Sequence, residues 1–479
     1  MLEKFIQNRI LEQLPFEANE GQRELLNKLS LFIVSPTPRK AFILRGYAGT
    51  GKTSIMAALV QSMLQLEQRI VLLAPTGRAA KVLSKYARVP AYTIHKYIYR
   101  GDRAMRQTFS LRDNLHKNTL FIIDEASMIS GQRDNPLFGS GCLLDDLVQF
   151  VYQGEGCSML LLGDNAQLPP VGSTISPALN INHMAGYDLA ITQHTLTHVA
   201  RQALDSAILH NANLLRPIAL GEKDAPNGIL STAMWQVLEI AKDIQTVNGE
   251  SLLTALEEAY QEVGTEDTIL LTRTNRRTNI YNQGIRSRIL WKDEEISNGD
   301  RLMVSKNNYF WTEKYENLPF LANGDMLEVV RIRNIRELYG YRFADAQLKA
   351  LDYEWEIDAT IWLDTLFSDN PEANNTMHRE LFNRIAEDYP ELQNSRKKLT
   401  ETIYQSPYYN ALQIRMAYAV TGHKSQGGQW ARVFIDPYKG GEENPYPTTE
   451  ETLDFYRWLY TAITRATDRV YFIKNNKND

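Results

Sequence analysis

Short apolar runs that end in polar or glycine-rich segments recur along the first part of the chain. They occupy residues 41–44, 120–123 and 158–162. Continuous apolar runs of this length are typical of strands that are buried on both faces of a parallel sheet. Residues 54–64, which follow the first run, instead have the composition of a helix. The pattern predicts an α/β fold whose parallel strands deliver polar residues to one edge of a sheet.

A different pattern occupies the region between about residues 291 and 409. Its first half alternates apolar and polar residues between turn signals, as in residues 299–304 and 323–330. This alternation predicts the short strands of a small β-barrel. Residues 372–404 instead indicate amphipathic helices that are interrupted near Pro390. We therefore expect a barrel with a helical elaboration, inserted into the α/β fold.

The segment from Gly46 to Thr53 reads Gly-Tyr-Ala-Gly-Thr-Gly-Lys-Thr and fits the phosphate-loop pattern G-x-x-x-x-G-K-[ST]. It lies between a predicted strand and a predicted helix, which is the context that the motif requires. Its glycines let backbone N–H groups point at one anion, while Lys52 reaches the outer phosphates and the Thr53 hydroxyl binds a magnesium ion. The predicted nucleotide ligands are Gly46, Ala48, Gly49, Thr50, Gly51, Lys52, Thr53 and Ser54.

Polar side chains that suit phosphoryl transfer follow the next two apolar runs. Asp124 and Glu125 come directly after residues 120–123, and Gln167 follows residues 158–162. Asp124 is suited to hold magnesium, and Glu125 to orient or deprotonate the attacking water. The amide of Gln167 can sense a γ-phosphate by hydrogen bonding. Together with Lys52, these residues predict a catalytic edge for hydrolysis of a nucleoside triphosphate.

Several uncommon blocks then follow one another in a fixed order along the chain. They read GYAGTGKTS, APTGRAAK, TIHK, FIIDEAS, GDNAQLPPV, VARQ, VTGHKSQG and YTAITRAT. In wording and order they resemble the motifs of superfamily-one helicases, and in particular the RecD-like and Pif-like branch. The resemblance extends from about Gln22 to Asp468. It implies two RecA-like P-loop motor domains with parallel sheets, powered by ATP and moving 5′ to 3′ on single-stranded DNA.

The resemblance also assigns roles to residues of the nucleotide site. It implies that Gln22 recognises adenine and that Gly427 lies toward ATP. Arg201 and Arg465 resemble the two arginines that reach the γ-phosphate from across a cleft, where a guanidinium stabilises developing negative charge.

A second set of residues is implied to contact nucleic acid. The blocks that carry them combine hydroxyls, backbone amides and basic side chains, which suit a phosphate backbone. For Asn275 a solvated helix start is an equally good interpretation. The set comprises Pro75, Thr76, Gly77, Arg78, Thr93, His95, Asn275, Thr421 and His423.

Two inserts divide the predicted motor. Residues 98–117 suit a small projecting hairpin, which by resemblance is the wedge that separates strands, with Tyr99 and Phe109 as wedge residues; an inert surface loop is the alternative. Residues 291–409 resemble the SH3-like barrel of this branch. The first RecA-like domain is then expected at 1–97 and 118–200, and the second at 201–290 and 410–479.

Composition limits the partners and the location. Hydrophobic residues make up 43% and charged residues 23%, which is ordinary for a soluble globular protein. With no apolar run of membrane-spanning length, we expect a cytoplasmic protein. We separately expect it to act as a monomer. Cys142 and Cys157 lack the spacing of a metal site, so magnesium carried with ATP is the metal implied. The net charge of −5 does not exclude DNA, since local potential in a groove decides binding.

The sequence therefore predicts an ATP-dependent DNA helicase whose partners are single-stranded DNA and DNA forks. An RNA or RNA–DNA hybrid helicase is a first alternative, because motifs that contact the backbone do not distinguish the sugars. A nucleic-acid-binding module that is switched by ATP without productive unwinding is a second. The complete hydrolytic set of Glu125, Arg201 and Arg465 argues against the second alternative.

Overall fold

The structure is a computed structural model that describes residues 1–101, 109–133, 138–198, 206–312, 315, 320–352, 355–392, 394–441 and 443–474. The chain divides into two compact units. Unit 1 comprises Met1–Asn248 and Ser425–Asp479, and unit 2 comprises Gly249–Lys424. Each unit is described by itself.

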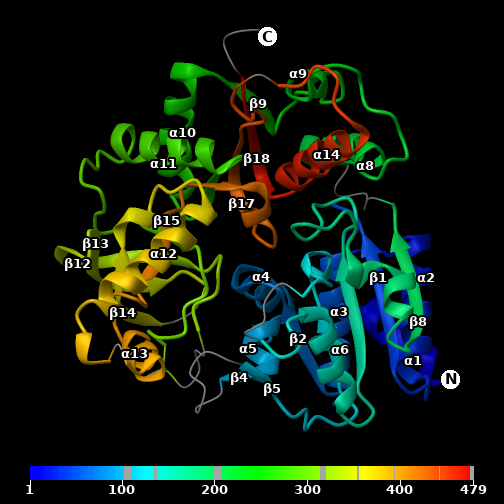
Figure 1. The fold of residues 1–479 in the computed structure, drawn as a ribbon. Helices are drawn as coiled ribbons and strands as arrows, with labels where there is room; N and C mark the ends of the chain where they lie inside the picture. Colours follow the sequence, from blue (N-terminus) through cyan, green and yellow to red (C-terminus); the bar gives the residue numbers. More distant parts are fainter. Residues whose placement is uncertain are drawn as a thin grey trace. The chain divides into compact units, whose positions relative to one another are not determined.

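A six-stranded parallel sheet forms the centre of the amino-terminal part of unit 1 (Figure 1). Its spatial order is β3-β2-β6-β7-β1-β8, so β1 lies between β7 and β8. All three apolar runs of the sequence form strands of this sheet, which confirms the predicted parallel α/β fold. The strands are β1 (Lys40–Gly46), β2 (Ile70–Ala74), β3 (Ala91–Thr93), β6 (Leu120–Ile123), β7 (Ser158–Gly163) and β8 (Ala190–Leu196).

Helices pack against this sheet around a core of apolar side chains. Phe42 and Leu44 of β1, Ile122 of β6 and Leu160 of β7 are fully buried in that core. Burial of these apolar surfaces is the main favourable contribution to folding here. The helices are α1 (Leu2–Glu12), α2 (Glu20–Val34), α3 (Lys52–Gln65), α4 (Gly77–Ala87), α5 (Ile94–Ile98), α6 (Leu143–Gln153) and α7 (Ile181–Ala185).

The carboxyl-terminal segment of the chain belongs to unit 1 as well. Its strand β18 pairs in parallel with β17 and with β9, which comes from the earlier segment of unit 1. Helix α14 contacts α8 and starts with a capping box in which the Thr448 and Glu451 side chains each accept from the other residue's backbone N–H. These elements are α8 (Ala207–Ala219), α9 (Leu230–Ala233), β9 (Ile244–Val247), β17 (Trp430–Ile435), α14 (Thr449–Ile463) and β18 (Ala466–Ile473).

Unit 2 contains a closed five-stranded barrel (Figure 1). This confirms the small barrel that alternation predicted, although its last strand lies beyond the expected end of the insert at residue 409. Side chains such as Leu302, Leu348 and Ile414 fill its interior. The strands are β11 (Arg301–Val304), β12 (Met326–Leu338), β13 (Tyr341–Ala350), β14 (Glu356–Trp362) and β15 (Leu412–Met416).

The remaining elements of unit 2 flank the barrel. Helices α12 (Pro371–Ala386) and α13 (Arg396–Ile403) bury Leu381 and Ile403 with Trp362 of the barrel wall. A short 3-10 turn begins at Pro390 between them, as the sequence predicted. Strand β10 (Thr268–Thr272) pairs in parallel with β16 (Ala419–Thr421), and helices α10 (Gly249–Val263) and α11 (Asn275–Arg288) precede and follow β10.

A two-stranded antiparallel hairpin occupies part of the predicted wedge. It pairs β4 (Tyr99–Gly101) with β5 (Phe109–Leu111), while residues 102–108 lie outside the described part. Tyr99 is 1% and Phe109 6% exposed, because both rings pack on Phe138. The sequence analysis named these two rings as wedge residues, whereas the structure buries both against Phe138. The wedge itself stays a prediction.

Across the described helices, none is both long and apolar enough to cross a membrane.

Candidate nucleotide-binding and catalytic site

The phosphate loop joins the end of β1 to the start of α3. Gly46 closes the strand and Lys52 is the first residue of the helix. Gly49 and Gly51 have φ angles of 74° and 82°, a left-handed conformation that favours glycine. At Gly51 an added Cβ would also come within 2.8 Å of Gln22 Nε2. Lys52 Nζ donates to the Gly46 carbonyl at 3.3 Å, so the lysine folds back over the loop.

Gln22, at the start of α2, forms a hydrogen bond to the backbone of this loop. Its Nε2 donates to the Thr50 carbonyl at 3.0 Å, and its Oε1 accepts the Asn19 backbone N–H at 3.0 Å. The second bond belongs to the capping box that starts α2, in which Asn19 accepts from the Gln22 backbone N–H. Gln22 is 1% exposed, so in this structure its amide positions the phosphate loop. Its adenine contact stays a prediction.

Two carboxylates, Asp124 and Glu125, follow the end of β6, which β7 separates from β1 in the sheet. Burial and the adjacent Glu125 charge raise the pKa of Asp124 to about 6, while Lys52 opposes the shift. The phosphate-loop lysine is therefore near enough to Asp124 to favour its charged form. Glu125 has a φ of 50°, and its N–H donates to Asp124 Oδ1 at 2.9 Å. Its Oε2 is buried and has no hydrogen-bond partner among the described residues.

An unsatisfied buried carboxylate oxygen fits a site that receives water or a hydrated ion. Across the described part of the chain no cluster of three or more His, Cys, Asp and Glu side chains could hold a metal by itself. A magnesium ion that is bound through one hydroxyl, one carboxylate and phosphate oxygens does not need such a cluster. Thr53 and Asp124 offer that hydroxyl and that carboxylate.

Arg465 enters the site from the end of α14. Its Nη1 lies 4.0 Å from Glu125 Oε1, and Nε and Nη1 donate to the carbonyls of Thr461 at 3.1 Å and Gly428 at 3.2 Å. Arg465 is 4% exposed, and these two hydrogen bonds to backbone carbonyls fix the position of its guanidinium group. The structure therefore brings together Lys52, Asp124, Glu125 and Arg465. Arg201 lies outside the described residues.

A tyrosine that sequence reasoning did not assign bridges the phosphate loop and the end of β7. Tyr460 Oη donates to Asp164 Oδ2 at 2.6 Å and accepts the Ala48 backbone N–H at 2.9 Å. Burial raises the pKa of Asp164, and the pKa of Tyr460 is raised by burial and by Asp164. Both residues belong to blocks quoted above, GDNAQLPPV and YTAITRAT, but their pairing is visible only in three dimensions.

The segment after Asp164 is held by further bonds to the carboxyl-terminal part of unit 1. The Leu168 N–H donates to Thr461 Oγ1 at 2.9 Å, and Gln426 Nε2 donates to the Leu168 carbonyl at 2.6 Å. Gln167 is 6% exposed, and its Oε1 is buried without a hydrogen-bond partner in the described structure. The predicted γ-phosphate sensor therefore has a free amide oxygen.

The predicted nucleic-acid residues at the start of α4 lie near Gly427. Thr76, which follows Pro75, caps α4 by accepting the Ala79 N–H at 3.2 Å. Gly427 has a φ of 73°, and an added Cβ would come within 3.1 Å of Thr76 Oγ1. Arg78, next to Gly77, donates to the Gln429 carbonyl at 3.0 Å and stacks 4.2 Å from the Trp430 ring centroid.

Two further candidates of unit 1, Thr93 and His95, lie at the start of α5. Thr93 caps this helix by accepting the Lys96 N–H at 3.3 Å. Burial lowers the pKa of His95 to about 4, and its ring packs 5.2 Å from Phe138. A neutral, packed imidazole suits a supporting role for the neighbouring hairpin, and the DNA contact stays a prediction.

The candidates of unit 2 lie where its parallel strands end. Thr421 is the last residue of β16 and pairs with Thr272 of β10. His423 lies in the 3-10 turn Gly422–Ser425. Asn275 begins α11 and donates to the Asp369 carbonyl at 3.3 Å. Their nucleic-acid contacts stay predictions.

Comparison with known proteins adds two family matches. The AAA domain family matches residues 17–225, and the UvrD-like helicase C-terminal domain family matches residues 416–473. An uncharacterised protein of Acanthamoeba polyphaga mimivirus is 25% identical and covers 95% of this chain and 99% of its own length. The ATP-dependent DNA helicase dda of Enterobacteria phage T4 is 24% identical over 66% of this chain and 67% of dda.

Two more similarities are partial or distant. The ATP-dependent RecD2 DNA helicase of Deinococcus radiodurans is 30% identical over an alignment that covers 41% of this chain and 23% of the RecD2 chain. A solved Pif1 helicase from Bacteroides, in complex with ADP-AlF3 and ssDNA, is 13% identical. The alignment covers 95% of this chain and 92% of the Pif1 chain, with a TM-score of 0.46. At this TM-score we assign no site residue from that structure.

Proposed function

This chain is a superfamily-one helicase of the Pif-like and RecD-like branch, and from that premise we propose that it hydrolyses Mg-ATP to move 5′ to 3′ along single-stranded DNA and to open duplex ahead of it. The observation that carries the proposal is the meeting of Glu125, Lys52 and Arg465 at the phosphate loop. A protein that only binds a nucleotide needs no buried carboxylate beside an arginine at that point.

The hydrolytic roles follow from the chemistry of these groups. Lys52 and the loop amides hold the phosphates, and Glu125 orients and deprotonates the attacking water. Arg465 stabilises the charge that develops on the γ-phosphoryl group, and Arg201 is proposed to do the same. Gln167 senses that group through its free amide.

Magnesium completes the proposed site. Thr53 and Asp124 would hold it, and the ion would neutralise negative charge on the phosphate oxygens during transfer. Asp124 is suited to this because a nearby cation offsets the cost of its buried charge.

Movement follows if nucleotide binding draws the two proposed motor domains together. Arg201 and Arg465 come from residues 201–290 and 410–479, while the phosphate loop belongs to the first proposed domain. Two DNA contacts that alternate in strength with each cycle then give net steps. The proposed contacts are Pro75, Thr76, Gly77, Arg78, Thr93, His95, Asn275, Thr421 and His423.

The proposal is tested with matched partial duplexes that carry either a 5′ or a 3′ single-stranded tail. With ATP and magnesium, we expect unwinding only from the 5′ tail, together with hydrolysis that single-stranded DNA stimulates. Unwinding only from the 3′ tail would contradict the polarity. Stronger stimulation by a matched RNA strand would favour the RNA motor, and hydrolysis without unwinding on any substrate would favour a nucleic-acid-binding switch.

A further inference from the structure

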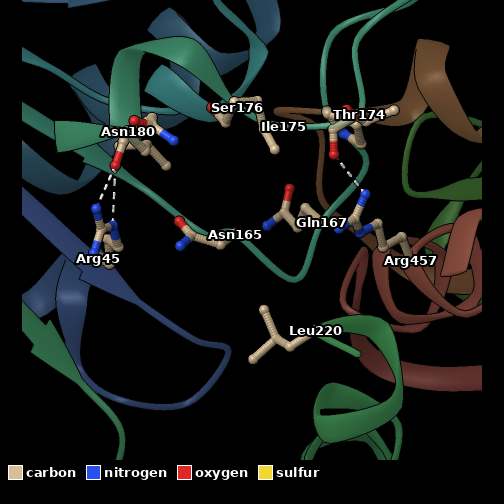
Figure 2. Close-up of a pocket in the computed structure, with 11 residues that line it drawn as sticks. Arg45, Asn165, Gln167, Thr174, Ile175, Ser176, Asn180, Leu220 and Arg457 are labelled. Atoms are coloured by element: carbon tan, nitrogen blue, oxygen red, sulfur yellow. Dashed lines mark hydrogen bonds between the residues drawn. The ribbon is translucent and has the colours of Figure 1, made fainter. Parts of the chain in front are cut away.

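A pocket beside Gln167 of the proposed catalytic site has a volume of about 280 Å³. Arg45 of β1 lies at one side and Arg457 of α14 at the other, with Asn165 and Gln167 between them (Figure 2). Thr174, Ser176 and Asn180 complete the polar part of its wall. Arg45 directly precedes the phosphate loop, yet Lys52, Asp124, Glu125 and Arg465 do not line the pocket.

Both arginines carry their charge without a carboxylate in the pocket wall. Arg45 donates from Nη2 to the Leu179 carbonyl at 2.6 Å and from Nη1 to Gln193 Oε1 at 3.1 Å. Arg457 donates from Nε to the Ala219 carbonyl and from Nη1 to the Thr174 carbonyl, at 3.0 and 2.8 Å. All four acceptors are uncharged.

The surroundings leave this positive charge only weakly compensated. No residue that lines the pocket is acidic, and the carboxylate that acts on Arg457 is Asp454, which is exposed one turn earlier on α14. Burial lowers the pKa of both guanidinium groups. Both side chains are half-buried, so each charge has lost part of its hydration, and an anion in the pocket would offset that loss.

Unused hydrogen-bonding groups line the same pocket. The oxygens of the Gln167 and Asn165 amides have no partner among the described residues, and Gln167 is 6% exposed. An amide can turn either its oxygen or its NH₂ group toward a ligand. Arg457 Nη2 likewise donates to no described residue, so two amides and a guanidinium can face one anion.

We propose that this pocket binds the orthophosphate that ATP hydrolysis produces, held between Arg45 and Arg457 with Asn165 and Gln167 as further donors. The inference rests on the proposed ATPase activity. Gln167 lines the pocket and is also the predicted γ-phosphate contact, so the proposed cleavage point and the pocket share this side chain. A phosphodiester of the DNA backbone offers the same chemistry from another source.

The test separates the pocket from the γ-phosphate position. The nucleotide site of the full chain is first filled with magnesium, ADP and beryllium fluoride, which stands in for the γ-phosphoryl group. Equilibrium dialysis then measures the binding of labelled orthophosphate. We expect one saturable phosphate per chain, with affinity at least tenfold weaker in Arg457→Gln and in Asn180→Asp.

The two variants change the charge of the pocket in different ways. Arg457→Gln removes a charge and one or more hydrogen bonds. Asn180→Asp adds a negative charge to the wall while an oxygen can still accept the His183 N–H, as Asn180 Oδ1 does at 3.0 Å. Arg39→Gln is the matched control, because Arg39 also donates to two carbonyls, those of Tyr187 and Asp188, but lies outside the pocket.

Absence of saturable binding to the wild type, or binding that Asn180→Asp leaves unchanged, would overturn the inference. A single-stranded oligonucleotide provides the second arm. If Arg457→Gln weakens the oligonucleotide while orthophosphate does not bind the wild type, the pocket takes a DNA phosphodiester and the product-phosphate assignment is wrong. Wild-type ATPase activity in the same preparation distinguishes these results from failure of the proposed function, which would abolish hydrolysis itself.

Discussion

Glu125 is the residue whose basicity the proposed reaction needs. Its Oε2 is buried without a partner in the described structure, and Arg465 approaches its other oxygen at 4.0 Å. Glu125→Gln keeps the shape but removes the base, so we expect the kcat of ATP hydrolysis to fall by about 10²- to 10⁴-fold. Binding of ATP, measured with a fluorescent analogue, should change by less than about threefold.

Glu155→Gln is the matched control for that variant. Glu155 is exposed and pairs with Lys117 at 2.7 Å, away from the phosphate loop. Its substitution should leave kcat unchanged. Undiminished hydrolysis in Glu125→Gln would exclude Glu125 as the base.

Removing the hydroxyl group should affect stability differently at two tyrosines that lie one turn apart on α14. Tyr460 Oη bonds Asp164 and the Ala48 N–H, whereas the buried hydroxyl of Tyr456 has no partner among the described residues. Tyr460→Phe leaves the Asp164 carboxylate without that donor and should lower the free energy of unfolding by about 1–3 kcal/mol. Tyr456→Phe removes only an unsatisfied group and should be neutral or stabilising. Chemical denaturation measures the free energy of unfolding of both variants. Equal losses of stability would contradict the different roles assigned to the two hydroxyl groups.

At the scale of elements, the hairpin of β4 and β5 has a buried side and an exposed side. Tyr99 and Phe109 are buried, and Tyr99 Oη donates to the buried Asp146 at 2.6 Å. Arg100 is exposed and pairs with Ser110 across the hairpin. If the hairpin is the wedge, Arg100→Ala should slow fork unwinding severalfold while DNA-stimulated ATPase activity stays within about twofold.

Tyr99→Phe is the companion variant for the hairpin. It should lower stability by about 1–3 kcal/mol, because the Asp146 carboxylate loses a buried donor. Parallel losses of ATPase activity and unwinding in Arg100→Ala would count against a wedge role for this side of the hairpin.

The helical elaboration of the barrel contains a histidine that is held neutral. His378 Nε2 donates to the Tyr409 carbonyl at 3.1 Å, and the two rings lie 4.3 Å apart. Burial, with a smaller effect of Lys306, lowers the pKa of His378 to about 4. The folded protein therefore binds fewer protons than the unfolded chain between about pH 6.5 and 4, and stability falls as pH falls through that window.

The expected loss is about 1.4 kcal/mol for each pH unit in that window. Thermal melting of the wild type should therefore decline more steeply from pH 7 to pH 5 than that of His378→Gln, whose amide can still donate to the Tyr409 carbonyl. Identical pH dependence of the two melting temperatures would show that His378 titrates normally.

At the scale of the whole molecule, the acidic balance limits how strongly salt affects DNA binding. The net charge is −5, so attraction to DNA depends on local groups and not on the sum. We expect affinity for single-stranded DNA to fall with salt with a logarithmic slope shallower than about −4, since each contacted phosphate contributes about −0.7. Fluorescence anisotropy across a salt series measures the slope, and a steeper value would indicate a more extensive basic surface.

The sequence by itself determined the strand, loop and helix of the nucleotide site, because these elements depend on local periodicity, glycine conformation and one short motif. The alternation in residues 299–304 and 323–330 also predicted the barrel, and Pro390 the break between its helices. These features are local, so a single sequence carries their signal.

Only the tertiary structure decided how distant blocks meet. The approach of Arg465 to Glu125, the bridge from Tyr460 to Asp164 and Ala48, and the burial of Tyr99 and Phe109 all join residues that are far apart in the chain or hidden by packing. An aromatic residue in a polar insert has the same local pattern whether its ring is exposed or buried. Its packing partners decide between the two, and they come from other elements of the fold.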